Sequence, residues 1–351
     1  MGSFLVTLSP LEPYFFGGER NFDFGQVRRK MKQSYFIRSQ ETPAQTTLLG
    51  ALRYAVLYAN DALIRNFTDA AQKKHAADLV GPKSFSFGER SDFGWIHSIS
   101  PLFILEDSHY LVPAPMNHKE SGKAKRYTPM KIERCEDVLS SVEDGLIAVD
   151  YDAKAGCTAG WVNVDSGEMI PPSDLFEGVV RLGIDTHRAE REEEGGYFKK
   201  EYKRLKRGSF AFFAEMEKVP ERLLDGVTVF LGQNKSAFLL RMQAHQNDLA
   251  DLVQQMLESR MDMPFWYALG DCLMNNSPSG FHIVRTRLFR HLTTSADNRY
   301  YHRYNKTEKL YRLVEGGSVF YGSEPEGADE AICNKIGMNH FIYVGGGKHE
   351  D

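Results

Sequence analysis

The chain has 351 residues, with 43 Lys and Arg against 47 Asp and Glu and a formal net charge of −4. A hydrophobic content of 42% and a charged content of 26% are ordinary for a globular protein, and they exclude a disordered tail, a collagen-like fibre and a disulfide-dense mini-domain. The near-neutral total also excludes a uniformly basic nucleic-acid binder, so any binding of a polyanion must use local basic patches.

The length and the cysteine content indicate two intracellular domains. Each half of the chain is long enough to bury its own core. The four cysteines lie far apart and form no CxxC pair, which argues against a zinc knuckle or a disulfide framework and favours a reducing, cytoplasmic setting. The amino terminus lacks the pattern of a secretory signal, and no apolar run approaches the ~20 residues of a membrane span, so we expect no membrane attachment.

The amino-terminal segment predicts a strand followed by a long loop. Apolar and polar residues alternate over residues 3–9, which is typical of a half-buried strand, and Pro10 ends the pattern. Residues 17–38 contain Gly, Asn, Asp and a basic run without a clear period. We therefore expect a long surface loop there, and long loops are often functional.

The segment from Thr42 to about Phe67 predicts the first helix. Thr42 is a suitable cap, the proline after it suits the first helical position, and Gln45 completes a capping box. Leu, Val and Ala then recur at three- and four-residue steps. Because a helix N-terminus carries the positive end of the helix dipole, we expect its free amides, with Gln45, Thr46 and Thr47, to face a phosphate group or a partner protein.

Strand patterns dominate the rest of the chain. We predict a hairpin from residues 102–105 and 109–112, an antiparallel pair from 197–205 and 209–216, a helix at 249–260, and further strands at 146–149, 178–184, 227–231, 237–242, 317–321 and 339–344. This order favours an α+β fold of two ferredoxin-like (RRM-like) domains with antiparallel sheets over a doubly wound fold. We place the domains at residues 1–172 and 173–351, the second with a C-terminal glycine-rich loop.

Two clusters of basic residues are the strongest functional signal. Residues 199–207 hold six basic side chains against one acidic, namely Lys199, Lys200, Lys203, Arg204, Lys206 and Arg207. Residues 285–312 hold eight against two, with interleaved aromatic residues, and include Arg285, Arg287, Tyr300 and Arg303. Lys and Arg neutralise phosphates while aromatic faces stack on unpaired bases, so this mixture suits single-stranded RNA. The alternative is an ordinary solvated face.

A glycine segment near the carboxyl end adds to this signal. Gly316, Gly317 and Ser318 lie between the second basic cluster and a predicted strand. Glycines allow backbone amides to approach a phosphate, and successive N–H groups in a turn form an anion nest. We therefore expect this loop to approach the RNA backbone, the alternative being a plain β-turn.

The sequence contains few signs of catalysis. It has no HExxH or GxSxG pattern, and a calcium-loop start at residues 150–152 lacks its final acidic ligand because Trp161 stands there. His187 follows a predicted strand and precedes Arg188, an arrangement that a metal-independent ribonuclease could use for its general base. A histidine in a surface turn is the plainer interpretation. We expect no metal, no cofactor and no catalytic residue.

Several segments together resemble a known family. They are LSPLEPYFF at residues 8–16, TPAQTTLLGALR at 42–53, LVPAP at 111–115, GID at 183–185 with Arg188 and EGGYF at 194–198, GGSVFY at 316–321 and IGMN at 336–339. In this order they are similar to the RAMP superfamily subunit that binds the crRNA 5′ tag in type III-B (Cmr) CRISPR complexes. The resemblance implies RNA contact at residues within these motifs, among them Arg53, Arg188 and Gly337. Asn339 departs from the family pattern, which has a second glycine there.

The resemblance implies a non-catalytic, RNA-binding scaffold. Such a subunit would hold the 5′ tag of the crRNA, contact the large polymerase/cyclase-type subunit and abut the first backbone RAMP subunit, with only indirect contact to target RNA. The type III-A subunit with the same role is one alternative. Another is a metal-independent crRNA-processing endoribonuclease of the same superfamily with His187 or another histidine as its base. A small-molecule enzyme, the third, would show no salt-dependent affinity for RNA.

Overall fold

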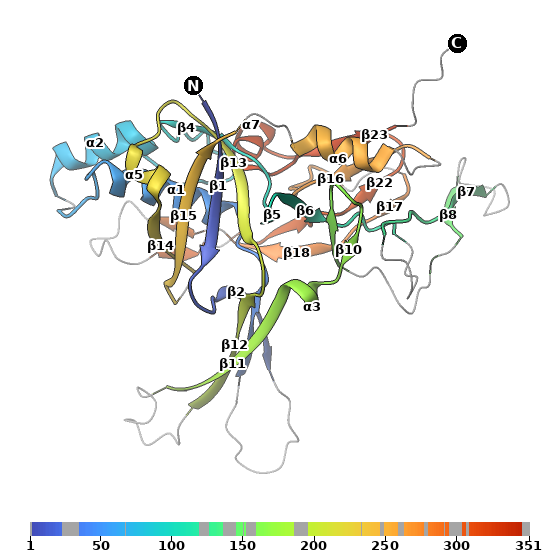
Figure 1. Ribbon diagram of the computed structural model, residues 1–351, viewed down its shortest axis with the longest axis horizontal. Coiled ribbons are helices and arrows are strands. Elements are labelled where there is room, and N and C mark those ends of the chain that lie inside the picture. Colours follow the sequence, from blue (N-terminus) through green and yellow to red (C-terminus); the bar gives the residue numbers. More distant parts are fainter. Residues whose placement is uncertain are drawn as a thin grey trace.

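Figure 1 shows the computed structural model of the chain. It describes residues 2–22, 35–66, 68–118, 126–135, 145–149, 151, 159–185, 196–232, 234–245, 249–258, 263–276, 280–290, 292–294, 304–306 and 309–345. The predictions for His187, Arg188, Tyr300 and Arg303 lie outside these residues. Within the described ranges the fold is mixed α/β with mainly antiparallel strands and few helices, as the sequence predicts. No helix in them is long and apolar enough to cross a bilayer.

The body is built on a nine-stranded antiparallel sheet, here called the main sheet. In spatial order its strands are β10 (Met169–Ile170), β9 (Trp161–Asn163), β6 (His109–Pro113), β5 (Phe103–Glu106), β13 (Ser209–Met216), β1 (Gly2–Pro10), β15 (Ser236–Ala244) and β14 (Val227–Leu231), and β4 (Ile96–Ile99) also pairs with β13. The amino-terminal β1 lies well inside the sheet, because Val6 is opposite Phe212 on one side and Met242 on the other.

Helices cover one face of the main sheet. Helix α1 (Gln45–Ala59) and the short α5 (Glu221–Asp225) pack on the sheet, and α2 (Ala70–Val80) packs on α1. Leu48, Leu52 and Val56 recur along one side of α1 and are fully buried, as are Val6 and Leu8 of β1. The helical period of α1 and the alternation of β1 therefore meet in one core.

A second sheet carries the carboxyl-terminal part of the chain. Its order is β17 (His282–Ile283), β22 (Val319–Phe320), β16 (Phe265–Ala268) and β23 (Phe341–Val344). Helix α6 (Leu249–Glu258) comes just before β16 along the chain. The short helix α7 (Glu330–Cys333) and the 3-10 turn η1 (Asn334–Ile336) lie between β22 and β23 along the chain. Three two-stranded pieces are β7 (Ile132–Cys135) with β8 (Gly145–Ala148), β18 (Thr286–Phe289) with β21 (Tyr311–Val314), and β19 (Leu292–Thr294) with β20 (Tyr304–Lys306).

A four-stranded sheet projects from the body, and we call it the arm (Figure 1). Its order is β11 (Phe176–Asp185), β12 (Gly196–Leu205), β3 (Tyr35–Gln40) and β2 (Phe16–Phe22), with β12 and β3 parallel. The one-turn helix α3 (Pro172–Leu175) leads into β11. Part of the loop predicted over residues 17–38 therefore forms strands.

The predicted antiparallel pairing of residues 197–205 with 209–216 is wrong. Both segments are strands, but β12 belongs to the arm and β13 to the main sheet. The physical difference is in burial: β13 buries Phe210, Phe212 and Ala214 at the centre of the body, whereas residues 199–205 of β12 are mostly charged and only Tyr202 among them is buried. The polar turn at residues 206–208 is where the chain passes from one sheet to the other rather than the tip of a hairpin.

The predicted start of the first helix is also wrong. Helix α1 begins at Gln45, and its N-cap is Ala44, which makes no side-chain capping bond. Thr42 lies outside the helix, since the first helical hydrogen bonds run from the N–H groups of Thr47 and Leu48 to the Ala44 carbonyl, at 2.8 and 3.2 Å. The helix ends at Ala59 rather than near Phe67. There the Asn60 side chain donates to the Val56 carbonyl at 2.8 Å, and Asp61 takes a left-handed φ of 53°.

The strands do not follow the proposed division at Pro172. The main sheet draws β1, β4, β5, β6, β9 and β10 from before this residue and β13, β14 and β15 from after it. The arm likewise pairs β2 and β3 with β11 and β12. The division into residues 1–172 and 173–351 therefore does not separate independent sheets.

Candidate nucleic-acid interface

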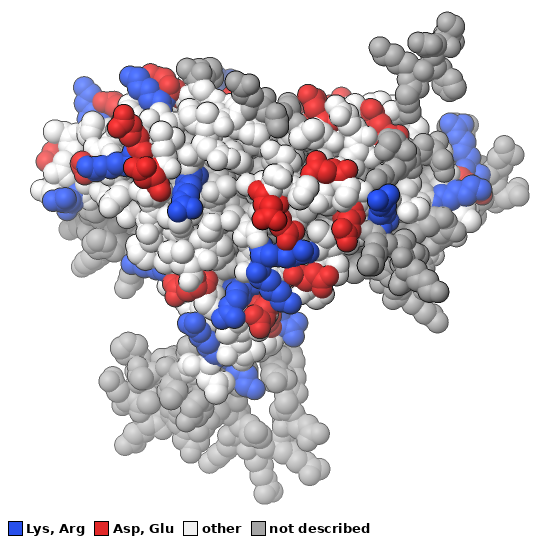
Figure 2. Space-filling view, viewed as in Figure 1, with Lys and Arg blue, Asp and Glu red and all other residues white. Residues whose placement is uncertain are grey.

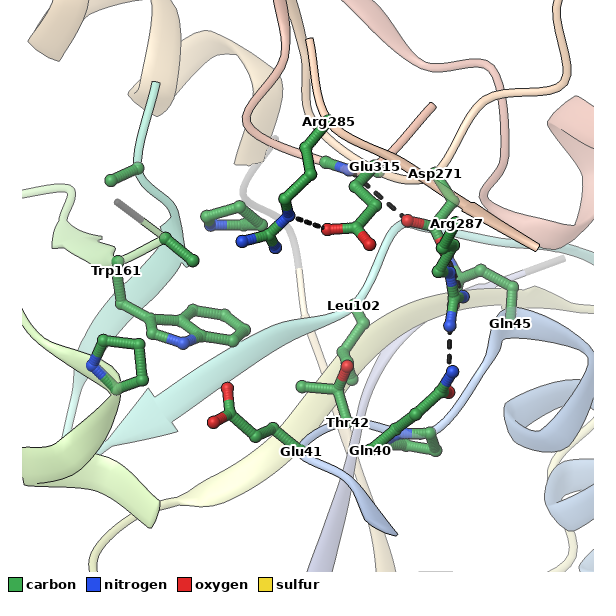
Figure 3. Close-up of a pocket in the computed structure, with 18 of the residues that line it drawn as sticks. Gln40, Glu41, Thr42, Gln45, Leu102, Trp161, Asp271, Arg285, Arg287 and Glu315 are labelled. Atoms are coloured by element: carbon green, nitrogen blue, oxygen red, sulfur yellow. Dashed lines mark hydrogen bonds and ion pairs between the residues drawn. The ribbon is translucent and has the colours of Figure 1, made fainter. Parts of the chain in front are cut away.

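A pocket of about 490 Å³ lies where the main sheet, the arm and the second sheet meet, and we call it the junction pocket (Figure 3). Its walls come from the β3–α1 connection, the end of β6, the start of β9, Lys203 of β12, the segment after β16, the start of β18 and the glycine loop. Its volume is in the range of about 300–1,000 Å³ that is usual for ligand sites.

Five residues predicted to contact RNA line this one pocket. They are Gln45, Lys203, Arg285, Arg287 and Gly316. They come from segments that are distant along the chain, so the fold rather than the sequence brings them together. Gly317 and Ser318 follow in the same loop and are buried.

Gln45 holds the start of α1 in place at the edge of the pocket. Its side chain is only 6% exposed, and its Nε2 donates to the carbonyl oxygens of Ser100 at 3.1 Å and Gly337 at 2.8 Å. Gly337 has a φ of 76°, and a Cβ there would lie 2.2 Å from the Ser100 oxygen. The Gln45 side chain thus joins the start of α1 to the backbone at Ser100 and Gly337. Thr46 and Thr47 are half-buried in the first turn.

Two ion pairs fix the basic residues of the pocket. Arg285 pairs with Glu315, and Arg287 pairs with Asp271 and also donates to the Gln40 side chain at 2.9 Å (Figure 3). Charged pairs of this kind fix the direction of a guanidinium group. The two arginines are therefore held in place and partly neutralised before any ligand arrives.

The glycine loop is packed against the protein. Gly317 has a φ of 93°, its N–H donates to the Ala268 carbonyl at 2.8 Å, and a Cβ there would lie 2.6 Å from the Ala114 oxygen. Ser318 is fully buried, and its hydroxyl donates to the Glu315 carbonyl at 2.7 Å. Gly316 is half-buried and faces the pocket. The requirement for glycine at 317 thus has a cause within the fold.

The remaining predicted residues lie away from the pocket. Arg53 joins α1 to the end of α2, with bonds of 3.0 and 3.1 Å to the carbonyls of residues 80 and 81. Lys199, Lys200 and Arg204 are on β12 of the arm. Figure 2 shows basic side chains gathered where the arm leaves the body, with acidic ones among them. Lys203 is itself paired with Glu201 at 2.8 Å.

Glu41 and Trp161 are among the pocket residues that were not predicted from the sequence. Glu41 is half-buried, and its carboxylate makes no hydrogen bond or ion pair in the described part of the chain. Burial raises the pKa of this carboxyl, while Lys203 and Arg285 oppose the rise. Trp161, only 7% exposed, contributes an apolar wall. Neither residue has a local pattern that marks it, because its role depends on distant segments.

Two observations on the described residues concern metal binding and thiol reactivity. No group of three His, Cys, Asp or Glu side chains among them could hold a metal ion. Burial raises the pKa of the Cys272 thiol well above its ordinary value and that of Cys333 to about 12, which keeps both in the unreactive protonated form. What the pocket offers a ligand is fixed charges, hydrogen-bonding groups and an apolar wall.

Comparison with known proteins identifies the family. The family model of the CRISPR-associated protein Cas_Cmr3 matches residues 6–263. The chain belongs to the Cmr3 family. This confirms the resemblance drawn from the sequence motifs. The matched region contains the main sheet except the first residues of β1, and it also contains the arm with Lys203. It ends before Arg285, Arg287 and the glycine loop, so one side of the junction pocket lies beyond it.

Solved structures with low sequence identity are also similar to this member of the Cmr3 family. A chain of the type III-B Cmr-beta bound to cognate target RNA and AMPPnP is 12% identical, with 90% of this chain and 85% of that chain covered and a TM-score of 0.46. A chain of the type III-B Cmr-beta bound to cognate target RNA is 13% identical, with 90% of this chain and 85% of that chain covered and a TM-score of 0.46. A chain of the Csm3-Csm4 subcomplex in the type III-A CRISPR-Cas interference complex is 9% identical, with 98% of this chain and 97% of that chain covered and a TM-score of 0.37. No curated protein matches the sequence.

Proposed function

We propose that this protein is a non-catalytic RNA-binding scaffold of a type III-B CRISPR ribonucleoprotein, which holds the 5′ tag of the crRNA. In this role it bridges the large polymerase/cyclase-type subunit to the backbone filament. Membership of the Cmr3 family supports the setting. The observation that carries the RNA-binding role is the meeting of Gln45, Lys203, Arg285, Arg287 and Gly316, which were selected for RNA contact from separate segments, in one pocket.

We also propose that the chain contains two ferredoxin-like units. The strand orders support this. In the first unit the spatial order is β15, β1, β13 and then β4 and β5, and in the second it is β23, β16, β22 and β17. When the strands of each unit are numbered along the chain, both orders read 4-1-3-2, the pattern of a split βαβ fold. Helices α1 and α5 occupy the crossover positions of the first unit. On this assignment the boundary falls between β15 and β16, at residues 245–264, and the arm is an insertion in the first unit.

Incubation of the whole protein with repeat-derived RNA in EDTA tests the proposed function. We expect tight binding that weakens as salt is raised, and intact RNA after incubation, because cations that contact phosphates release counterions. Defined cleavage products would favour the endoribonuclease alternative. Absence of any salt-dependent RNA affinity would contradict the scaffold role and leave the small-molecule alternative.

A further inference from the structure

The junction pocket has almost balanced charge. Four basic and three acidic side chains line it. Arg285 and Arg287 are paired with Glu315 and Asp271. A phosphate site gains its affinity from cations that are free to neutralise the ligand. The centre of this pocket therefore suits a neutral, planar group with hydrogen-bonding edges better than it suits a phosphate.

The Glu41 carboxylate is an open acceptor in the pocket. Figure 3 shows it below the Arg285–Glu315 pair and beside the indole of Trp161, directed into the space between them. It has no hydrogen bond or ion pair with any residue that the structure describes. An ionised carboxylate is a pure acceptor, so one that faces a pocket without a protein partner can offer both oxygens to the donors of a ligand.

Arg285 supplies donors on the opposite side. Its Nε donates to the Glu315 carboxylate, while its two terminal amino groups point into the pocket above Glu41 (Figure 3). The side chain is 48% exposed, so these groups are accessible to a ligand. The pocket thus sets a cationic donor facing a two-oxygen acceptor.

An apolar wall flanks these two groups. Leu102, Pro113 and Trp161 line the pocket, and Trp161 packs against Phe176 at a ring-centroid distance of 6.2 Å. Unpaired RNA bases are commonly held by stacking on such surfaces while their edges are hydrogen-bonded. A planar base fits an arrangement of this kind, in which the wall covers the face and the polar groups read the edge.

We propose that the junction pocket holds one unstacked guanine base of the bound RNA, with the Glu41 carboxylate accepting from its N1–H and N2–H₂ groups and Arg285 donating to its O6. Guanine is the RNA base whose Watson–Crick edge places two adjacent donors beside an acceptor. Adenine and cytosine offer one amino group there, and the single imino donor of uracil lies between two oxygens. This inference rests on the proposed RNA-binding function.

The test uses short single-stranded oligouridylates that carry one internal guanosine, adenosine or cytidine. We expect the guanosine oligomer to bind the whole protein roughly ten- to hundred-fold more tightly than the others, the range that a bidentate base contact gives. The Glu41→Gln variant should lose this preference, because an amide offers one acceptor and opposes the second base donor with a donor of its own. Glu168→Gln, an exposed glutamate outside the pocket, is the charge-matched control and should keep the preference.

The outcomes distinguish a failure of the guanine assignment from a failure of the RNA-binding function. Tight binding of all oligomers without a preference for guanosine, or an unchanged preference in Glu41→Gln, would overturn the guanine assignment alone. Failure to bind any of these oligomers or repeat-derived RNA would overturn the RNA-binding function as well. Guanosine monophosphate alone is expected to bind weakly. If it bound as tightly as the guanosine oligomer, the pocket would be a free-nucleotide site and the assignment to RNA would be wrong.

Discussion

The glycines at positions 317 and 337 are required by the protein backbone. Both have positive φ, and in each case a Cβ would lie within 2.6 Å of a carbonyl oxygen, of Ala114 and Ser100 respectively. Only glycine avoids both the conformational strain and the clash. The expectation that the loop approaches RNA stays a prediction, and it now rests on Gly316, the loop glycine that lines the pocket.

We expect Gly317→Ala to reduce the free energy of unfolding more than Gly322→Ala. Gly322 has a φ of 109° but no atom within 4 Å of an added Cβ, so alanine there meets only backbone strain, about 1–3 kcal/mol. Alanine at 317 also collides with the Ala114 oxygen and should cost roughly 1–3 kcal/mol more. Urea unfolding of the two variants measures the difference. Equal losses would mean that the close contact has no energetic weight.

We expect Glu41→Gln to stabilise the protein at neutral pH. Burial raises the folded-state pKa of this carboxyl, so the ionised form is disfavoured in the fold at every pH above that raised value. As the pH falls through the raised pKa toward the unfolded value of about 4.3, the wild-type carboxyl takes up a proton and the advantage of glutamine should vanish. The charged groups that set this balance are Lys203 and Arg285, which lower the pKa, and Glu201 and Glu315, which raise it.

Thermal unfolding of both proteins across this pH range checks the prediction. A stability difference that stays constant with pH, or that grows as the solution becomes more acid, would contradict it. A residue that lowers stability and is nevertheless placed in a pocket is consistent with a binding role, since strain and unpaired groups are tolerated where function needs them.

At the scale of elements, the hydrophobic pattern predicted which segments form strands and helices better than it predicted which strands pair with each other. The alternation in β1, the hairpin β5–β6, the strands β14 and β15 and the helix α6 are confirmed. The wrong pairing of β12 with β13 has a simple cause: the turn signal at Arg207-Gly208 is real, but a glycine turn also serves to carry a chain from one sheet to another. Neighbours in sequence are only the default neighbours in a sheet.

The arm is expected to contribute a salt-dependent part of RNA binding. Changing Lys199, Lys203 and Arg204 together to Ala should flatten the slope of log affinity against log salt by about two units if all three contact phosphate. Lys203 and Arg204 are already paired, with Glu201 and Glu177. If only Lys199 contacts phosphate, the change should be about 0.7. Titrations of repeat-derived RNA at several salt concentrations give the slope, and an unchanged slope would make the arm cluster a solvated face or a protein-docking surface.

At the scale of the whole molecule, the sequence predicted some of the residues that line the junction pocket, but it did not predict that they lie together. Composition marked Lys203, Arg285 and Arg287, and a motif marked Gln45, because basic clusters and helix starts are local signals. Glu41 and Asp271 carry no such signal, since a single acidic residue is unremarkable until the fold sets it beside an arginine from another segment. Sheet order decides which residues meet, and short segments do not encode it.

Repeat-derived RNA should stabilise the whole fold. A ligand that binds only the native state at 100 times its dissociation constant adds about 2.7 kcal/mol to the free energy of unfolding. The pocket is lined by both large sheets and the arm, so its occupant should raise the unfolding midpoint of all three together. Thermal melts followed by far-ultraviolet circular dichroism, with an equal concentration of double-stranded DNA as control, measure this. No shift with RNA would contradict a site at the junction.

The position of β1 inside the main sheet has a consequence for how the protein is made. Its two neighbours are β13 and β15, and Gly2 pairs with Met216. At about 5–20 residues per second, a ribosome delivers the first of these partners roughly 10–40 seconds after β1. During that interval a strand with two open edges and an apolar side must stay unpaired. Residues 2–10 therefore cannot take their place in the main sheet until residues 209–216 have been made.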